Sequence, residues 1–141
     1  MSKIRVLFVC IHNSARSQMA EGFLRHLAGD RFEVASAGIE PGALNPVVVQ
    51  VMKERGIDIS RHWAKGVEAL VAAEGGFDYV ITVCDESQAA RCPVVPGPAR
   101  RLHWGFDDPS SFEGSPEDRL VFTRRVRDRI EESLKEWLAT F

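Results

Sequence analysis

The feature that most constrains the fold of this chain is a mostly apolar segment near its start, from Ile4 to Val9, which ends at Cys10. Runs of this kind, rich in β-branched residues, are typical of a strand buried on both faces of a parallel sheet. A polar loop follows, after which apolar residues recur at helical spacing from Met19 to Leu27, just before Gly29. A buried strand, a short loop and an amphipathic helix in this order predict an α/β fold.

The rest of the chain continues this alternation. Further strands are expected at 32–37, 77–83 and 102–104, and further helices at 46–56, 67–73 and 115–138. Asn45-Pro46 and Ser115-Pro116 each place a capping residue before a proline, which is typical of a helix start. We therefore predict one domain over residues 1–141, with an open four-stranded parallel sheet and helices on both faces.

The composition narrows the range of partners. The 141 residues carry a net charge of -2 and no basic stripe, so nucleic acid is not expected to bind. The sequence has no export signal and no apolar stretch of about 20 residues, the length that spans a bilayer. We expect a cytoplasmic protein without membrane contact, whose three cysteines act as thiols with individual roles.

The loop after the first strand has the residues that a thiolate attacking a tetrahedral oxyanion requires. Cys10 ends the strand, and Arg16 and Ser17 open the helix. Arg16 offers a two-pronged donor to the anion, and the helix dipole favours the thiolate form of Cys10. Ser17 or Ser14 can hydrogen-bond that thiolate. The expected oxyanion-binding residues, through their backbone N–H groups and the arginine side chain, are Ile11, His12, Asn13, Ser14, Ala15 and Arg16.

Two points stay open on the residues alone. Cys10 could be an ordinary buried cysteine at a strand end, although Arg16 at this offset favours the catalytic interpretation. Expulsion of an oxygen from the oxyanion needs a general acid, for which Asp107 and Asp108 are the candidates. Both aspartates could equally serve only to form the turn before Pro109.

Several motifs together resemble the low-molecular-weight phosphotyrosine phosphatase fold and, within it, the thioredoxin-coupled arsenate reductases. They are Val9-Cys10, Asn13-Ser14-Ala15-Arg16-Ser17-Gln18-Met19-Ala20-Glu21-Gly22, Ser36-Ala37-Gly38, Gly56-Ile57-Asp58-Ile59-Ser60 and His103-Trp104-Gly105-Phe106-Asp107-Asp108-Pro109. The resemblance covers nearly the whole chain. It implies that Asp108, the aspartate before proline, is the general acid.

The same comparison favours a reductase over a phosphatase. The phosphatases share a second cysteine in the loop and a proline after Arg-Ser, and this chain has neither. They also place tyrosines after Asp-Pro, where this chain has Ser110-Ser111-Phe112. Cys84 and Cys92 match the two resolving cysteines of the reductases.

The resemblance implies a thiol relay. Cys10 attacks arsenate while Asp108 protonates the departing oxygen. Cys84 then attacks Cys10 and releases arsenite, and Cys92 attacks Cys84. The Cys84–Cys92 disulfide passes to thioredoxin or a similar dithiol protein, so no cofactor is needed. Residues 85–91 are expected to begin as a short helix and partly to unwind or loop out during turnover, because a rigid helix would hold the Cα atoms of Cys84 and Cys92 too far apart for a disulfide.

Other functions are considered beside this one. The chain could be a low-molecular-weight protein phosphatase that hydrolyses phosphate monoesters, or a non-catalytic module that binds oxyanions or senses redox state. A zinc site of Cys84, Cys92 and His103 has no usual ligand spacing. Phosphate and sulfate are expected as analogues of arsenate, and the protein is expected to be a monomer.

A cation site is the last implication of the resemblance. In some of these reductases a potassium ion lies on residues that correspond to Asn13, Glu21 and Ser36. Those members carry an aspartate where this chain has Lys65. The implied potassium site is therefore at most vestigial, and the lysine ammonium can take the place and the charge of the ion. No other metal is expected.

Overall fold

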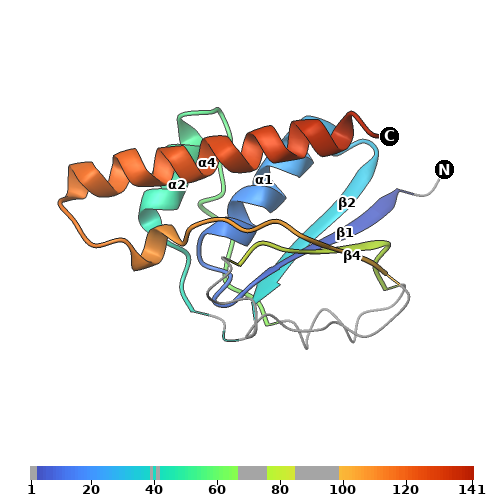
Figure 1. Ribbon diagram of the computed structural model, residues 1–141, viewed down its shortest axis with the longest axis horizontal. Coiled ribbons are helices and arrows are strands. Elements are labelled where there is room, and N and C mark those ends of the chain that lie inside the picture. The colour runs from blue at the N-terminus through green and yellow to red at the C-terminus, as the bar shows by residue number, and fades with distance from the viewer. Residues whose placement is uncertain (1–2, 39, 41, 67–75, 85–98) are drawn as a thin grey trace.

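The computed structural model of the chain (Figure 1) describes residues 3–38, 40, 42–66, 76–84 and 99–141. The strands are β1 (Ile4–Cys10), β2 (Phe32–Gly38), β3 (Tyr79–Thr82) and β4 (Arg100–His103). The helices are α1 (Arg16–Ala28), α2 (Pro46–Lys53), the short 3-10 helix η2 (Pro109–Ser111) and α4 (Pro116–Leu138). The strands form one four-stranded parallel sheet, as predicted, and their order is β2-β1-β3-β4.

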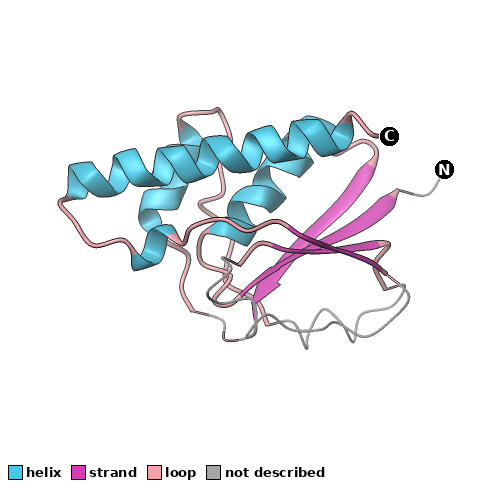
Figure 2. Ribbon diagram, in the orientation of Figure 1, coloured by secondary structure: helices cyan, strands magenta, loops and turns pink. Residues whose placement is uncertain are grey.

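β1 is an inner strand, and its residues from Val6 to Cys10 are buried, on both faces of the sheet. Phe8 belongs to the main core with the residues of α1, whereas Leu7 and Val9 pack on the other face with Ala37 and Val80. Figure 2 shows α1, α2 and α4 on one side of the sheet, with α4 lying over the other two. The helices predicted at 67–73 and 85–91 fall outside the described residues.

The ends of α2 follow the predicted signals. The side chain of Asn45 accepts a hydrogen bond from the N–H of Val47 at 2.9 Å. At the other end Gly56 has a φ of 75°. The N–H of Gly56 donates to the carbonyl of Lys53 at 3.0 Å, and the N–H of the following residue donates to the carbonyl of Met52 at 3.1 Å. This is a Schellman motif, which explains why a glycine stops the helix here.

α4 begins with a capping box, also as predicted. Ser115 accepts a hydrogen bond from the N–H of Asp118, and the Asp118 carboxylate accepts one from the N–H of Ser115. Pro116 occupies the first turn, where its missing N–H costs nothing.

Two strands differ from their predicted bounds. β3 is shorter than 77–83, and β4 begins at Arg100 rather than at Leu102. β4 is an edge strand whose first residues, Arg100 and Arg101, are exposed, so no apolar run marks its start. Among the helices that the structure describes, none combines the length and the apolar character needed to cross a membrane.

Candidate active site

The sulfur of Cys10 lies at the carboxyl end of β1, where ligands bind in parallel sheets. It is buried and accepts a hydrogen bond from the N–H of Asn13 at 3.0 Å. The Oγ of Ser17 lies 2.9 Å from the same sulfur. Because Ser17 Oγ accepts a hydrogen bond from Asn13 Nδ2 at 2.7 Å, its own hydrogen is available for Cys10. Ser17 rather than Ser14 therefore holds the sulfur, and Ser14 Oγ lies 3.4 Å from Ser110 Oγ instead.

Three carbonyl groups of the loop are tied to the chain that follows β2. The carbonyls of Ile11, His12 and Ser14 accept hydrogen bonds from the N–H groups of Glu40, Gly42 and Asn45 at 2.8, 3.0 and 2.9 Å. In a planar trans peptide the C=O and the next N–H point in opposite directions. The bond to the His12 carbonyl thus turns the Asn13 N–H toward the sulfur. By the same geometry, the N–H groups of His12 and Ala15 point away from the chain that follows β2.

His12 supports this anchoring with its side chain. Its Nδ1 lies 2.9 Å from the carbonyl oxygen of Glu40. The ring therefore orients the neighbouring backbone, which is one of the two roles, solvated or backbone-orienting, that its position in the loop suggests.

The structure also brings the segment that carries Asp107 and Asp108, the two candidate acids, to the loop after β1. The buried guanidinium of Arg16 donates to the carbonyl of Phe106 at 3.1 Å, and its second terminal nitrogen lies 3.5 Å from Asp108 Oδ2. Asp108 accepts hydrogen bonds from Ser110 N and Ser111 Oγ, both at 3.0 Å. Asp107 is exposed. Of the two candidates it is Asp108 that faces Arg16.

Cys84 follows β3 and is fully buried in the same core cluster as Cys10. The N–H of Val83 donates to the carbonyl of Val9 at 2.9 Å, so the segment that carries Cys84 continues beside the end of β1. Cys10 is a free thiol, whereas Cys84 is disulfide-bonded. Cys92 lies outside the described residues.

Two residues named for the predicted cation site, Ser36 and Lys65, lie beside a buried carboxylate, that of Glu21. Ser36 Oγ donates to Glu21 Oε1 at 2.5 Å, and Arg25 lies 2.8 Å from Glu21 Oε2. The ammonium of Lys65 lies 3.7 Å from Glu21 Oε1 and donates to the carbonyl of Trp63 at 3.0 Å. Burial lowers the pKa of Lys65, and the charge of Glu21 opposes this shift.

The imidazole of His62 also lies beside this carboxylate, with Nδ1 at 3.9 Å from Glu21 Oε2. Burial lowers the pKa of His62, against the opposing charge of Glu21. Asn13 does not face Glu21 in the same way, since its Oδ1 accepts a hydrogen bond from the backbone N–H of Lys65 at 2.8 Å. In the part of the chain that the structure describes, no group of three or more His, Cys, Asp or Glu side chains is arranged to hold a metal ion.

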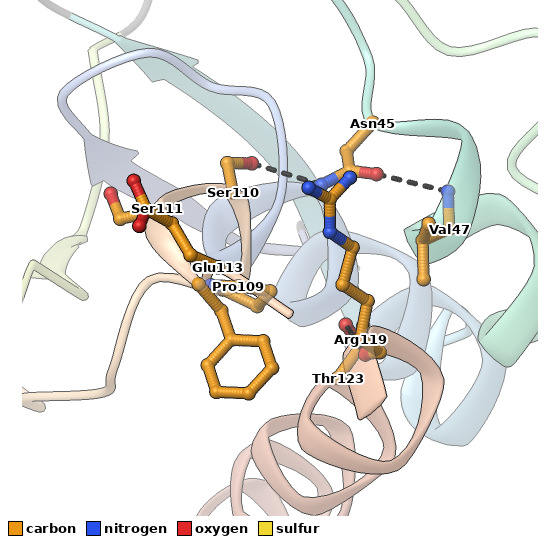
Figure 3. Close-up of a pocket in the computed structure, with 9 residues that line it drawn as sticks. Asn45, Val47, Pro109, Ser110, Ser111, Glu113, Arg119 and Thr123 are labelled. Atoms are coloured by element: carbon orange, nitrogen blue, oxygen red, sulfur yellow. Dashed lines mark hydrogen bonds between the residues drawn. The ribbon is translucent and has the colours of Figure 1, made fainter. Parts of the chain in front are cut away.

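A pocket of about 380 Å³ lies beside Asp108, between the start of α2 and the start of α4 (Figure 3). Asn45 Nδ2 donates to Ser110 Oγ at 3.0 Å across it, and the guanidinium of Arg119 points toward Asn45. Because Ser110 also contacts Ser14 of the loop, this pocket adjoins the candidate active site. Its lining residues are Asn45, Val47, Pro109, Ser110, Ser111, Phe112, Glu113, Arg119 and Thr123.

Comparison with known proteins agrees with this geometry. Residues 5–141 match the family described as low molecular weight phosphotyrosine protein phosphatase. The chain belongs to this family. An arsenate reductase of Bacillus licheniformis is 44% identical over 140 residues, which is 99% of each chain.

Two solved arsenate reductases are also similar in structure to this chain. An arsenate reductase in the phosphate-binding state superposes with a TM-score of 0.76 at 31% identity, covering 97% of this chain and 98% of that one. A thioredoxin-dependent arsenate reductase of Corynebacterium glutamicum has a TM-score of 0.67 at 32% identity, covering 99% of this chain and 64% of that one.

One polar residue of the site, Gln18, had no role assigned from sequence. It is fully buried and bonds to Asn13, His62 and Trp63. A glutamine in the first turns of an amphipathic helix gives no local signal of such contacts, because His62 and Trp63 lie far along the chain.

Proposed function

We propose that this chain reduces arsenate to arsenite, with Cys10 as the nucleophile. The observation that carries the proposal is the free Cys10 sulfur, held by Asn13 N–H and Ser17 Oγ inside an anion-binding loop whose Arg16 faces Asp108. The arsenate reductase relatives, similar to this chain over almost its whole length, support this choice of substrate.

In the first step the N–H groups of the loop and the Arg16 side chain bind the oxyanion. The Cys10 thiolate attacks arsenic(V) and forms an S–As bond, while an As–O bond breaks. Asp108 donates a proton to the departing oxygen, which leaves as water. The hydrogen bond from Ser17 stabilises the thiolate before attack.

The second step transfers electrons. The Cys84 thiolate attacks the Cys10 sulfur, and the S–As electron pair goes to arsenic, which is reduced to arsenic(III) and leaves as arsenite. Cys92 then attacks Cys84, restoring the Cys10 thiolate and leaving a Cys84–Cys92 disulfide. A dithiol protein, thioredoxin or one like it, reduces that disulfide, so the two electrons balance without a cofactor. Such a relay needs a reducing compartment, and we therefore place the protein in the cytoplasm.

A second candidate function is hydrolysis of phosphate monoesters, which the phosphatase family match favours. It shares the first step, with phosphorus in place of arsenic, and water would then hydrolyse the Cys10 phosphoenzyme. This reaction uses one thiol, so Cys84 and Cys92 would have no part in it.

Arsenate-dependent oxidation of reduced thioredoxin, by wild type and by each Cys→Ser variant, tests the relay. We expect no activity from Cys10→Ser and no multiple turnover from Cys84→Ser or Cys92→Ser. If Cys92→Ser cycles normally with thioredoxin, the relay is wrong. Fast hydrolysis of an aryl phosphate that survives both substitutions would favour the phosphatase, and phosphate binding without any thiol-dependent turnover would indicate a non-catalytic module.

A further inference from the structure

We propose that Gln18 is a positioning residue for the catalytic loop: it holds Asn13 in the conformation that directs both hydrogen bonds to the Cys10 sulfur. This inference rests on the proposed role of Cys10 as nucleophile. The hydrogen bonds of Gln18 go to Asn13, His62 and Trp63 and not to the sulfur, so it acts on the sulfur through Asn13.

The amide of Gln18 has hydrogen-bond partners on both its ends. Its Nε2 lies 3.1 Å from the carbonyl oxygen of Asn13, 3.0 Å from Asn13 Oδ1 and 2.9 Å from the carbonyl oxygen of Trp63. Its Oε1 lies 2.9 Å from His62 Nδ1. The opposite orientation would place Oε1 against three oxygens. The amide therefore has one acceptable orientation, and His62 must donate to it from Nδ1.

Asn13 needs such support because its φ is 53°. This left-handed conformation is unfavourable for residues with a Cβ, though less so for asparagine. Gln18 binds Asn13 at both its backbone and its side-chain oxygen, which fixes the peptide and the side chain together.

Both hydrogen bonds to the Cys10 sulfur depend on Asn13. The backbone N–H of Asn13 donates directly to Cys10 Sγ, and Asn13 Nδ2 donates to Ser17 Oγ, which leaves the Ser17 hydrogen for the sulfur. If Asn13 leaves the left-handed region, both donors move away. The thiolate then loses its charge-assisted hydrogen bonds and forms less readily.

The segment that carries Trp63 closes the network. Gln18 holds the carbonyl of Trp63, and the N–H of Lys65 donates to Asn13 Oδ1 at 2.8 Å. Asn13 is thus gripped both by Gln18 directly and by the segment that Gln18 helps to position. If Gln18 only filled space in the core, its hydrogen-bond partners would have no reason to lie around one residue of the loop.

The test uses the full chain with Cys84→Ser and Cys92→Ser, so that Cys10 is the one remaining thiol. Gln18→Met removes the amide but keeps the length of the side chain. Thr123→Val is the matched control, because Thr123 is equally buried and its Oγ1 donates within α4, to the carbonyl of Arg119 at 2.7 Å. The readouts are Tm and the rate of Cys10 alkylation by iodoacetamide as a function of pH, neither of which needs arsenate.

We expect Gln18→Met to move the midpoint of the alkylation profile up by about one pH unit, so that alkylation on the acidic side is about tenfold slower. Thr123→Val should lower Tm without moving that midpoint. An unshifted profile in Gln18→Met, with a loss of Tm like that of the control, would overturn the proposal.

If Gln18→Met does not fold, His62→Ala provides a second test of the proposal. It removes the partner of Gln18 Oε1 and leaves the amide and the loop in place. A smaller shift in the same direction supports the proposal, and an unshifted profile refutes it. Because alkylation is independent of turnover, a wild type that failed to reduce arsenate would contradict the proposed function and leave this test intact.

Discussion

Gly38 gives the sharpest test of how the loop after β1, which carries the proposed nucleophile, is held. It ends β2 and pairs with Cys10 in the sheet register. A Cβ added at Gly38 would lie 2.7 Å from the carbonyl oxygen of Ile11, 2.8 Å from Asn13 N and 2.9 Å from the carbonyl carbon of His12. All three are backbone atoms of the loop. Ordinary contacts begin at 3.4 Å, so the Ile11 oxygen would have to recede by about 0.7 Å.

Gly38 is also held by contacts with a second segment, so the loop rather than Gly38 would have to move. Its N–H donates to the carbonyl of Lys65 at 2.8 Å, and it forms a parallel bridge with Gly66. We therefore expect Gly38→Ala to lower the free energy of unfolding by about 1–3 kcal/mol, as overpacking does. For a domain of this size that is a fall in Tm of roughly 4 °C per kcal/mol. Because the loop would be displaced by most of an ångström, the kcat/KM of the variant should also fall by about 100-fold.

Calorimetry and the thioredoxin-coupled arsenate assay measure the two effects. Gly42→Ala is the matched control, because its Cβ would meet His12 Cβ at an ordinary 3.6 Å. If Gly38→Ala keeps the Tm and the kcat/KM of Gly42→Ala, the close approach of β2 to the loop does not hold the loop in place.

Three further predictions follow from the polar contacts. Asp108→Asn should lower kcat by about 100-fold or more while Cys10 alkylation stays at the wild-type rate, and an unchanged kcat would exclude Asp108 as the acid. Lys65→Met should make Tm higher in potassium than in sodium, because it removes the ammonium beside Glu21, whereas wild type should not distinguish the two ions. If the Tm of neither protein differs between potassium and sodium, the view that Lys65 takes the place of a cation is wrong. Hydrogen bonding by Arg124 keeps the pKa of Glu54 below its usual 4.5, so this carboxylate stabilises the fold above that pH and the contribution is lost as pH falls through the lowered value. Glu54→Gln should therefore show a smaller loss of Tm on acidification, and an acid profile equal to wild type would refute this.

Much of the fold could be predicted because its signals are local. The run from Ile4 to Val9, the caps at Asn45 and Ser115 and the stop at Gly56 each act over a few residues, through burial, side-chain capping and a left-handed turn. β4 was placed less well, since an edge strand with exposed arginines carries no apolar run.

In the candidate site, too, one part follows from local sequence and another part does not. The cysteine, the arginine and the serine of the loop are close in sequence, so their spacing alone predicts an oxyanion loop. Neither spacing nor composition chooses between Asp107 and Asp108, whereas in the structure it is Asp108 that lies 3.5 Å from Arg16, which supports our proposal that it is the acid. The position of Asp108 depends on how the segment that follows the edge strand β4 packs against the loop.

The amino-acid sequence is enough to predict the strand, the loop and the helix that present Cys10, because short-range periodicity and capping signals define those elements. The surroundings of the sulfur come from the tertiary structure: Ser17 rather than Ser14 lies beside it, and Gln18 lies behind Asn13, held by His62 and Trp63. His62 and Trp63 are far from Gln18 in the sequence, and distances of a few ångströms between such segments are fixed only when the sheet and its helices pack together.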